Sequence, residues 1–178
     1  MKLLIYGMTE DEKKTLAEIR QQVDVEEIAF ADGIFTKDRI VEVDGFRAIW
    51  IMTNSMIGEE EARLLSEHGV RYIVSRAAGI DHLDLEALRK YGIKAANVPS
   101  YSPNAISEHT LMLLLNALRH MRRSEAMVAR RDFGIAGLCG REIRTMTIGV
   151  IGAGRIGTLT IKVLVALGAK VLVHARHV

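Results

Sequence analysis

Short apolar runs alternate with charged, helix-patterned segments from Met1 to about Pro99. The apolar runs are rich in β-branched residues, and the charged segments carry apolar side chains at helical spacing, so they predict strands and helices in turn. Gly69 and Gly92 are placed to end two of the helices. This alternation is typical of an α/β domain with a parallel sheet, here of about five strands. The expected strands are KLLIYG, VDVEEIAFA from Val23, FRAIWIMT, RYIVSR and IKAANVP, and the expected helices are EDEKKTLAEIRQQ, GEEEARLLSEHG and DLEALRKYG.

A different pattern begins at NVPSYSPNAISEH, which contains both prolines of the chain. The apolar residues that follow recur at helical spacing and predict one long helix, capped by Ser102 or Asn104 and extending to about Arg130. After it, DFGIAGLCG predicts a glycine-broken loop. The apolar positions of the helix are Ile106, Leu111, Leu114, Leu115, Leu118 and Met121.

A third pattern consists of a strand, a glycine turn, a helix and a second strand. The turn GAGRIG follows the apolar strand Thr147–Ile151 and precedes the predicted helix Arg155–Leu167, after which AKVLVHA predicts the second strand. In such a turn the first glycine permits the bend, the second lets the backbone approach a pyrophosphate, and the third lets the helix pack on the strand. The helix N-terminus then binds the phosphates. The residues expected at this dinucleotide site are Gly152, Gly154, Arg155, Ile156 and Gly157.

These patterns predict an α/β chain with a flavodoxin-like parallel-sheet N-terminal domain and the first β-α-β unit of a Rossmann domain. The prolines mark the expected boundary. We divide the chain into a first domain over residues 1–101, a hinge helix and loop over 102–144, and an incomplete dinucleotide-binding domain over 145–178.

The end of the second strand bears on the choice between NAD and NADP. An NAD site usually carries an acidic residue about 20 residues after the glycine turn, where it accepts hydrogen bonds from the adenine ribose. Here that position is Ala175, and it is followed by Arg176, which can face a ribose 2′-phosphate instead. These two residues favour NADP slightly, and NAD stays open.

Composition narrows the partners. With 24 basic and 22 acidic residues, the formal charge of +2 gives no strong attraction to nucleic acid or to an anionic membrane. Cys139 is the only cysteine, no Cys/His cluster has zinc-ligand spacing, and no apolar stretch approaches the ~18 residues of a membrane span. We therefore expect a cytoplasmic protein with no metal site.

Arginines crowd between residues 119 and 144, where a nucleic-acid surface is one interpretation. Aromatic residues for base stacking are nearly absent there, with Phe133 alone, so a solvated helix face and a phosphate-facing loop are favoured. The arginines are Arg119, Arg122, Arg123, Arg130, Arg131, Arg141 and Arg144.

Four motifs in order carry a family resemblance. The run SRAAGIDHLDLEALRKYGIKAANVPSYSPNAISEHT, followed by RRDF, GREIR and GVIGAGRIG, resembles the D-isomer-specific 2-hydroxyacid dehydrogenases, and most of all their D-lactate dehydrogenase branch. The match extends almost continuously from about Arg71 to Lys170. The resemblance implies an enzyme of two α/β domains that reduces pyruvate or another small 2-oxo acid with hydride from NAD(P)H, and residues 1–101 then form its substrate domain.

The resemblance also implies site residues. The backbone at Ala78 and Gly79 would hold the substrate carboxylate, a task that fixed N–H donors suit well. Tyr101 matches the tyrosine that faces the substrate in the lactate branch, although a boundary tyrosine half-packed against the hinge is an equal alternative. Ala77 stands where some relatives have Asn, which removes one polar contact.

The family's catalytic Arg and its Glu–His pair would all follow Val178, so no residue of this chain is assigned as catalytic. Among the histidines that are present, His82 lies in a turn motif and His109 lies on the hinge helix, and both have structural explanations. We expect the chain to be C-terminally truncated. Two parallel strands leave edges and apolar faces uncovered, which predicts a homodimer or a completing chain.

Two other functions remain open at this point. One is a catalytically silent dinucleotide-binding or corepressor-like protein of the same fold, and the other is a phosphoglycerate-type 2-hydroxyacid dehydrogenase, which differs only in its substrate. The motifs YSPNAISEH and GREIR favour the lactate branch over the latter.

Overall fold

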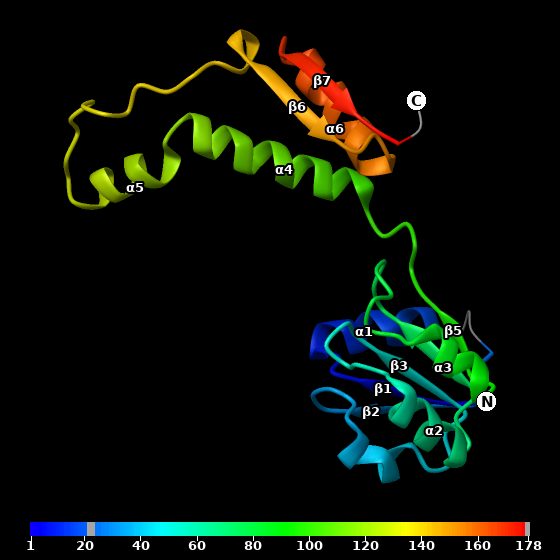
Figure 1. The fold of residues 1–178 in the computed structure, drawn as a ribbon. Coiled ribbons are helices and arrows are strands. Elements are labelled where there is room, and N and C mark those ends of the chain that lie inside the picture. Colours follow the sequence, from blue (N-terminus) through cyan, green and yellow to red (C-terminus); the bar gives the residue numbers. More distant parts are fainter. Residues whose placement is uncertain (21–23, 177–178) are drawn as a thin grey trace. The chain divides into compact units, whose positions relative to one another are not determined.

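The computed structural model describes residues 1–20 and 24–176, which form two compact units. Unit 1 comprises Met1–Tyr101 and unit 2 comprises Ser102–Val178. The division falls between the two prolines, and Figure 1 shows the elements of each unit.

Unit 1 is built on a parallel sheet of five strands in the order β2-β1-β3-β4-β5. This order is that of the flavodoxin-like fold, so the predicted fold class is confirmed. The strand expected from Val23 begins at Glu27, and Val23 itself lies outside the described residues. The strands are β1 (Lys2–Tyr6), β2 (Glu27–Ala31), β3 (Ala48–Ile51), β4 (Tyr72–Ser75) and β5 (Lys94–Ala96).

The three predicted helices of unit 1 are confirmed. Thr9 begins the first of them with a capping box, in which its side chain accepts from the Glu12 N–H while the Glu12 carboxylate accepts from the Thr9 N–H. Gly69 and Gly92 follow the other two with φ values of +88° and +70°, a conformation that glycine adopts without strain. The helices are α1 (Glu10–Ile19), α2 (Glu59–Glu67) and α3 (Leu85–Lys90), and a short 3₁₀ segment, η2 (Lys37–Val43), precedes β3.

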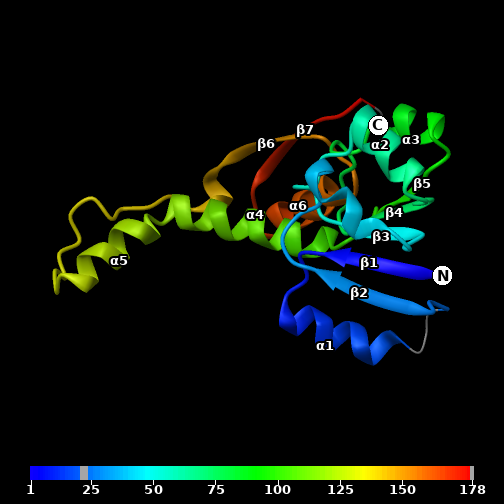
Figure 2. The same cartoon turned by 90° about the horizontal axis from the view of Figure 1, so that it is seen from below.

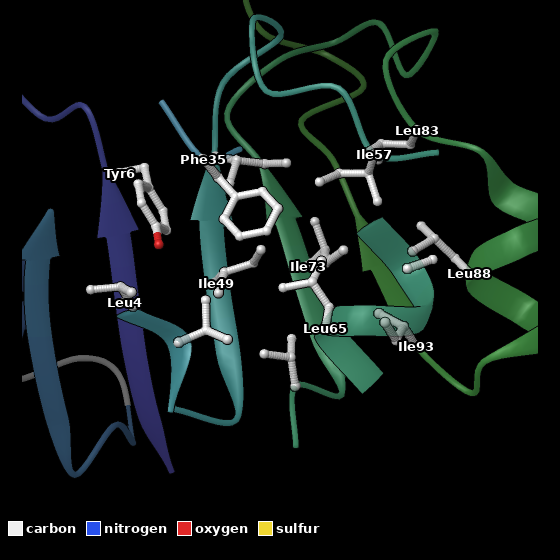
Figure 3. Close-up of a cluster of buried hydrophobic side chains, with 14 of the residues drawn as sticks. Leu4, Tyr6, Phe35, Ile49, Ile57, Leu65, Ile73, Leu83, Leu88 and Ile93 are labelled. Carbon is white, nitrogen blue, oxygen red and sulfur yellow. The ribbon is translucent and has the colours of Figure 1, made fainter. Parts of the chain in front are cut away.

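The sheet separates two layers of helix. Helix α1 lies on one face and α2 and α3 on the other (Figure 2). The main core fills the space between the sheet and α2 and α3, and Figure 3 shows strand and helix side chains meeting there. Burying each of these side chains stabilises the fold by about 1.5–3 kcal/mol. Fully or nearly buried members are Leu4, Tyr6, Phe35, Ile49, Ile51, Leu65, Ile73 and Leu88.

Unit 2 contains the predicted β-α-β unit. Strands β6 (Thr147–Ile151) and β7 (Lys170–His174) pair in parallel on either side of helix α6 (Arg155–Ala166) in the sequence. Helix α4 (Pro103–Leu118) packs along α6, so the expected hinge helix belongs to the same compact unit as the glycine turn. The small core between them contains Ile143, Leu164 and Ala169, with Leu111, Leu114, Leu118, Ile148, Val150 and Val171 packed against it.

The prediction of one continuous helix to about Arg130 is wrong. Helix α4 ends at Leu118, and a second helix, α5 (Met121–Ala129), begins after His120, whose backbone is left-handed at φ 52° and ψ 36°. The returning loop explains the break, because the Arg141 N–H donates to the Leu118 carbonyl at 3.0 Å. In an uninterrupted helix the Leu118 carbonyl would instead accept from the N–H of the residue four positions later in the chain.

The arginine-rich segment is solvent-exposed, as expected for a solvated face. All seven arginines between residues 119 and 144 are exposed, and so is Phe133. Within residues 1–20 and 24–176, none of the helices has the length and apolarity needed to cross a membrane.

Candidate functional site

The loop that follows β4 carries the residues expected to bind a carboxylate. Ser75 ends the strand in the core, and the chain then emerges so that Ala78 and Gly79 are exposed. Arg76 fixes the start of the loop: its N–H donates to the Ile51 carbonyl at 2.9 Å, and its guanidinium donates to the Gly7 carbonyl.

Backbone N–H groups are the chemistry that this loop offers. Among the described residues, the N–H groups of Ala78 and Gly79 have no hydrogen-bond acceptor. The carbonyls of the same two peptide groups are bonded, however. The Val98 N–H donates to the Ala77 carbonyl at 3.0 Å, and the Asn97 side-chain amide donates to the Ala78 carbonyl at 2.8 Å. Two adjacent unbonded donors on an exposed loop suit a small anion.

A buried polar pair closes the base of the loop. Ser75 Oγ and His82 Nε2 are joined by a hydrogen bond of 2.9 Å, and both residues are buried, His82 being only 5% exposed. Burial lowers the pKa of His82 below its ordinary 6.5, and the nearby Asp81 carboxylate opposes that shift. The imidazole is therefore neutral at pH 7.

The sequence analysis predicted neither the Ser75–His82 hydrogen bond nor the hydrogen bond from Asn97 to the Ala78 carbonyl. It assigned His82 to a turn and gave Asn97 no role. A signal existed at Ser75: the alternation of Ile73 and Ser75 along β4 places a hydroxyl on the buried side of the strand, and a buried hydroxyl requires a partner. Which residue supplies that partner follows only from the fold.

Tyr101, the third expected substrate contact, is the last residue of unit 1 and its side chain is 79% exposed. It directly precedes Ser102, whose hydroxyl accepts from the Ala105 N–H and begins α4 with Pro103 in its first turn. The structure therefore presents the tyrosine ring to solvent at the end of unit 1, directly before α4.

The glycine turn has the geometry that its sequence predicts. Gly152 leaves β6 with φ +95°, and its N–H donates to the His174 carbonyl at 2.7 Å. A Cβ on Gly157 would overlap the Gly152 carbonyl, so only glycine allows α6 to approach the strand here. Gly154 caps α6, and a Cβ built on it would meet no atom within 4 Å.

The space beside Gly154 is open at the start of a helix. Helix α6 begins at the next residue, and the first N–H groups of a helix, which lack acceptors within the helix, favour anions. A cavity of about 480 Å³ lies beside the turn, between α4, β6 and α6, but its lining contains no charged residue. This lining offers no charged group to a phosphate, so the backbone N–H groups of the turn are the candidate phosphate ligands.

The two residues expected to select the cofactor directly follow β7. The strand ends at His174, Ala175 is half-buried and Arg176 is exposed. This end of β7 lies at the same edge as the glycine turn, because the strands are parallel and Ile151 is paired with His174. No carboxylate occupies either position.

The part of the chain that the structure describes offers few other groups suited to metal binding or catalysis. No group of three or more His, Cys, Asp or Glu residues there is arranged to hold a metal ion. His109 on α4 is exposed, whereas His68 bonds the Asp44 carboxylate at 2.6 Å at the end of α2. Cys139 is a free, exposed thiol.

The loop after β4 and the glycine turn have counterparts in a known family. The family model for the catalytic domain of D-isomer specific 2-hydroxyacid dehydrogenases matches residues 3–175. This chain belongs to that family. The expectation drawn from the motifs is thereby confirmed, and it extends over nearly the whole chain.

Individual relatives and solved structures are similar to the chain over nearly its whole length. The D-lactate dehydrogenase of Leuconostoc mesenteroides subsp. cremoris is 33% identical over 177 residues, which are 99% of this chain and 54% of the relative. The apo-structure of D-lactate dehydrogenase from Escherichia coli superposes with a TM-score of 0.87 at 30% identity, covering 100% of this chain and 56% of that one. D-lactate dehydrogenase from Aquifex aeolicus, complexed with NAD and lactic acid, gives a TM-score of 0.79 at 28% identity, covering 96% of this chain and 50% of that one.

This chain therefore spans about half the length of the relatives that it matches. The matched half contains the loop after β4 and the glycine turn.

Alanine substitutions at Gly157 and Gly154 distinguish a glycine that close packing requires from one whose side-chain position is open. We expect Gly157→Ala to lower the free energy of unfolding of unit 2 by about 1–3 kcal/mol, because its Cβ overlaps the Gly152 carbonyl. Gly154→Ala should change it by less than about 0.5 kcal/mol, because the site is open and its φ of −72° is one that alanine adopts. Urea unfolding followed by circular dichroism measures both. Equal losses in the two variants would contradict this account.

Acid should destabilise unit 1 through His82. The folded state lowers the pKa of this imidazole, so the unfolded chain binds more protons just below pH 6.5 and stability falls as the pH falls through that value. We expect the free energy of unfolding to decrease between about pH 7.5 and 5.5, and to decrease less in His82→Gln, which keeps a hydrogen-bonding group but does not titrate. Urea unfolding across this range checks the prediction. An unchanged pH dependence in the variant would show that His82 is not the responsible group.

Proposed function

We propose that this chain carries the carboxylate-binding loop and the pyrophosphate-binding turn of an NAD(P)-dependent oxidoreductase that reduces a 2-oxo acid, such as pyruvate, to the D-2-hydroxy acid. The observation that carries the proposal is the pair of unbonded N–H groups at Ala78 and Gly79 in a chain of this family. The D-lactate dehydrogenase relatives support pyruvate as the substrate.

The chain's own groups bind and orient the reactants. The N–H groups of Ala78 and Gly79 hold the carboxylate of the 2-oxo acid, and the exposed ring of Tyr101 covers the substrate from the boundary. Two backbone donors bind a carboxylate without a competing side-chain charge, which fixes the direction of the adjacent carbonyl. A bound nicotinamide dinucleotide would supply the hydride.

The glycine turn holds the dinucleotide in this proposal. The first turn of α6, from Gly154 through Arg155 and Ile156 to Gly157, places its N–H groups and the positive end of the helix dipole at the pyrophosphate. The family's Arg and its Glu–His pair, which clamp the substrate and transfer the proton, are assigned to no residue of this chain.

A chimera of this chain with the C-terminal half of a relative tests the proposal. The 178-residue chain alone should not oxidise NADH or NADPH with pyruvate, whereas the same chain joined to the C-terminal half of the Leuconostoc mesenteroides D-lactate dehydrogenase should. Absorbance of the reduced nicotinamide follows the reaction, and a stereospecific lactate assay identifies the product. A folded chimera without activity would refute the proposed function. Turnover by the chain alone would show that its own residues transfer the proton.

We also propose a preference for NADP over NAD. Arg176 is exposed directly after β7 and can face a 2′-phosphate, while Ala175 offers no carboxylate to the ribose hydroxyls. Ala175→Asp should turn the preference toward NADH by about tenfold or more, because a carboxylate accepts from the ribose hydroxyls and repels the 2′-phosphate. Titrations of the chimera with both cofactors measure the ratio of their dissociation constants. Arg176→Ala serves as the control that weakens NADPH only, and a wild-type preference for NADH would overturn the proposal.

Two copies of the chain are proposed to associate in the cytoplasm. Helices α4 and α5 expose apolar side chains that a monomer would leave in water, among them Met112, Leu113, Leu115, Met121 and Val128. A chain that completes the edge of the β6–β7 pair is the alternative partner.

The oligomeric state distinguishes these partners. Light scattering after size exclusion should give the mass of a dimer for the wild-type chain and of a monomer for Leu113→Glu, which puts a charge on a side chain that is 54% exposed on α4. Val41→Glu, at a 68% exposed position in unit 1, is the matched control and should remain dimeric. A monomeric wild-type chain would contradict the dimer.

A further inference from the structure

The loop after β4 with Ala78 and Gly79 is the carboxylate-binding loop of the proposed function, on which this inference rests. Two N–H groups hold one carboxylate only when both point to the same side of the loop, yet Ala78 and Gly79 are exposed and contribute no side chain that could lock them. Ordering an exposed loop of this kind costs backbone conformational entropy. Some other group must fix the two peptide planes.

The segment that follows β5 supplies that group. Val98 donates its N–H to the Ala77 carbonyl at 3.0 Å, and Asn97 donates its side-chain N–H to the Ala78 carbonyl at 2.8 Å. In a planar trans peptide the carbonyl and the following N–H point in opposite directions. Holding the Ala77 carbonyl therefore turns the Ala78 N–H away from this segment, and holding the Ala78 carbonyl does the same for the Gly79 N–H.

The base of the loop is fixed independently. The Ser75–His82 hydrogen bond joins the residues on either side of the loop, and the His82 carbonyl accepts from the Ile57 N–H at 2.8 Å. Ile57 is fully buried and its own carbonyl accepts from the Asp84 N–H, so the returning end of the loop is anchored in the core. Only the peptides between these anchors remain to be set.

We propose that Asn97 is a positioning residue of the carboxylate site, whose side-chain amide orients the Gly79 N–H toward the substrate. Val98 performs the corresponding task for Ala78 through its backbone, which no side-chain substitution removes. Asn97 is half-buried and lies on the far side of the peptide from the proposed ligand, so it acts through the loop and does not touch the substrate.

The experiment uses the ¹⁵N-labelled 178-residue chain and three variants. Asn97→Leu keeps the approximate size of the side chain and removes the donor, Asn97→Gln keeps a donor on a longer stem, and Asn54→Leu makes the same change at an exposed asparagine elsewhere in unit 1. Oxamate, a close mimic of pyruvate, is the probe, and the amide resonances of Ala78 and Gly79 report on it.

Two readouts are measured. In the absence of ligand, relaxation should give an order parameter of about 0.85 for the Gly79 amide in the wild type and below about 0.6 in Asn97→Leu. On titration, oxamate should shift both amides in the wild type and bind about fivefold more weakly to Asn97→Leu, as expected for one lost hydrogen bond. Asn54→Leu should match the wild type, and Asn97→Gln should recover part of the affinity.

The outcomes separate the two proposals. An equally ordered Gly79 amide in the wild type and Asn97→Leu, or equal oxamate affinities, would overturn the positioning role. If oxamate shifts neither amide in the wild type, the carboxylate site of the proposed function is refuted, while relaxation still decides whether Asn97 orders the loop. If Asn97→Leu fails to fold, Asn97→Ala replaces it, because it also removes the side-chain donor to the Ala78 carbonyl and adds no apolar bulk.

Discussion

The parallel pairing of β4 with β5 brings together most of what the candidate carboxylate site needs. Because both strands run in the same direction, with Tyr72 opposite Lys94 and Val74 opposite Ala96, the segments that leave their carboxyl ends start side by side. One of these segments is the loop with Ala78 and Gly79, and the other begins with Asn97. An antiparallel neighbour would have placed the start of a strand there.

The same constraint organises unit 2. Strands β6 and β7 are parallel, so the glycine turn after β6 and the residues after β7 share an edge, and the Gly152 N–H donates to the last residue of β7. In open α/β sheets, ligands bind outside the carboxyl ends of the strands. Both candidate sites of this chain follow that rule, each within its own unit.

Backbone groups dominate the proposed chemistry. The N–H groups after β4 and those of the first turn of α6 are suited to anions, and neither set depends on a lysine or an arginine whose rotamers would have to be ordered. The price of using backbone donors is that other residues must hold the peptide planes. Asn97 and the Ser75–His82 pair supply that support in unit 1, and Gly157 supplies it in unit 2 by letting α6 approach β6.

The sequence by itself determined most of the elements and the family. Strand Thr147–Ile151, the turn glycines, a helix cap at Ser102 or Asn104 and the stops at Gly69 and Gly92 follow from local chemistry, because periodicity, capping and φ preferences act within a few residues. Tertiary structure decided what depends on residues far apart in the chain. The break at His120 requires the returning Arg141 N–H, and the contacts of Ser75 with His82 and of Asn97 with Ala78 require the packed sheet. Local patterns do not encode these partners, because each hydrogen bond is selected by the fold that brings its donor and acceptor together.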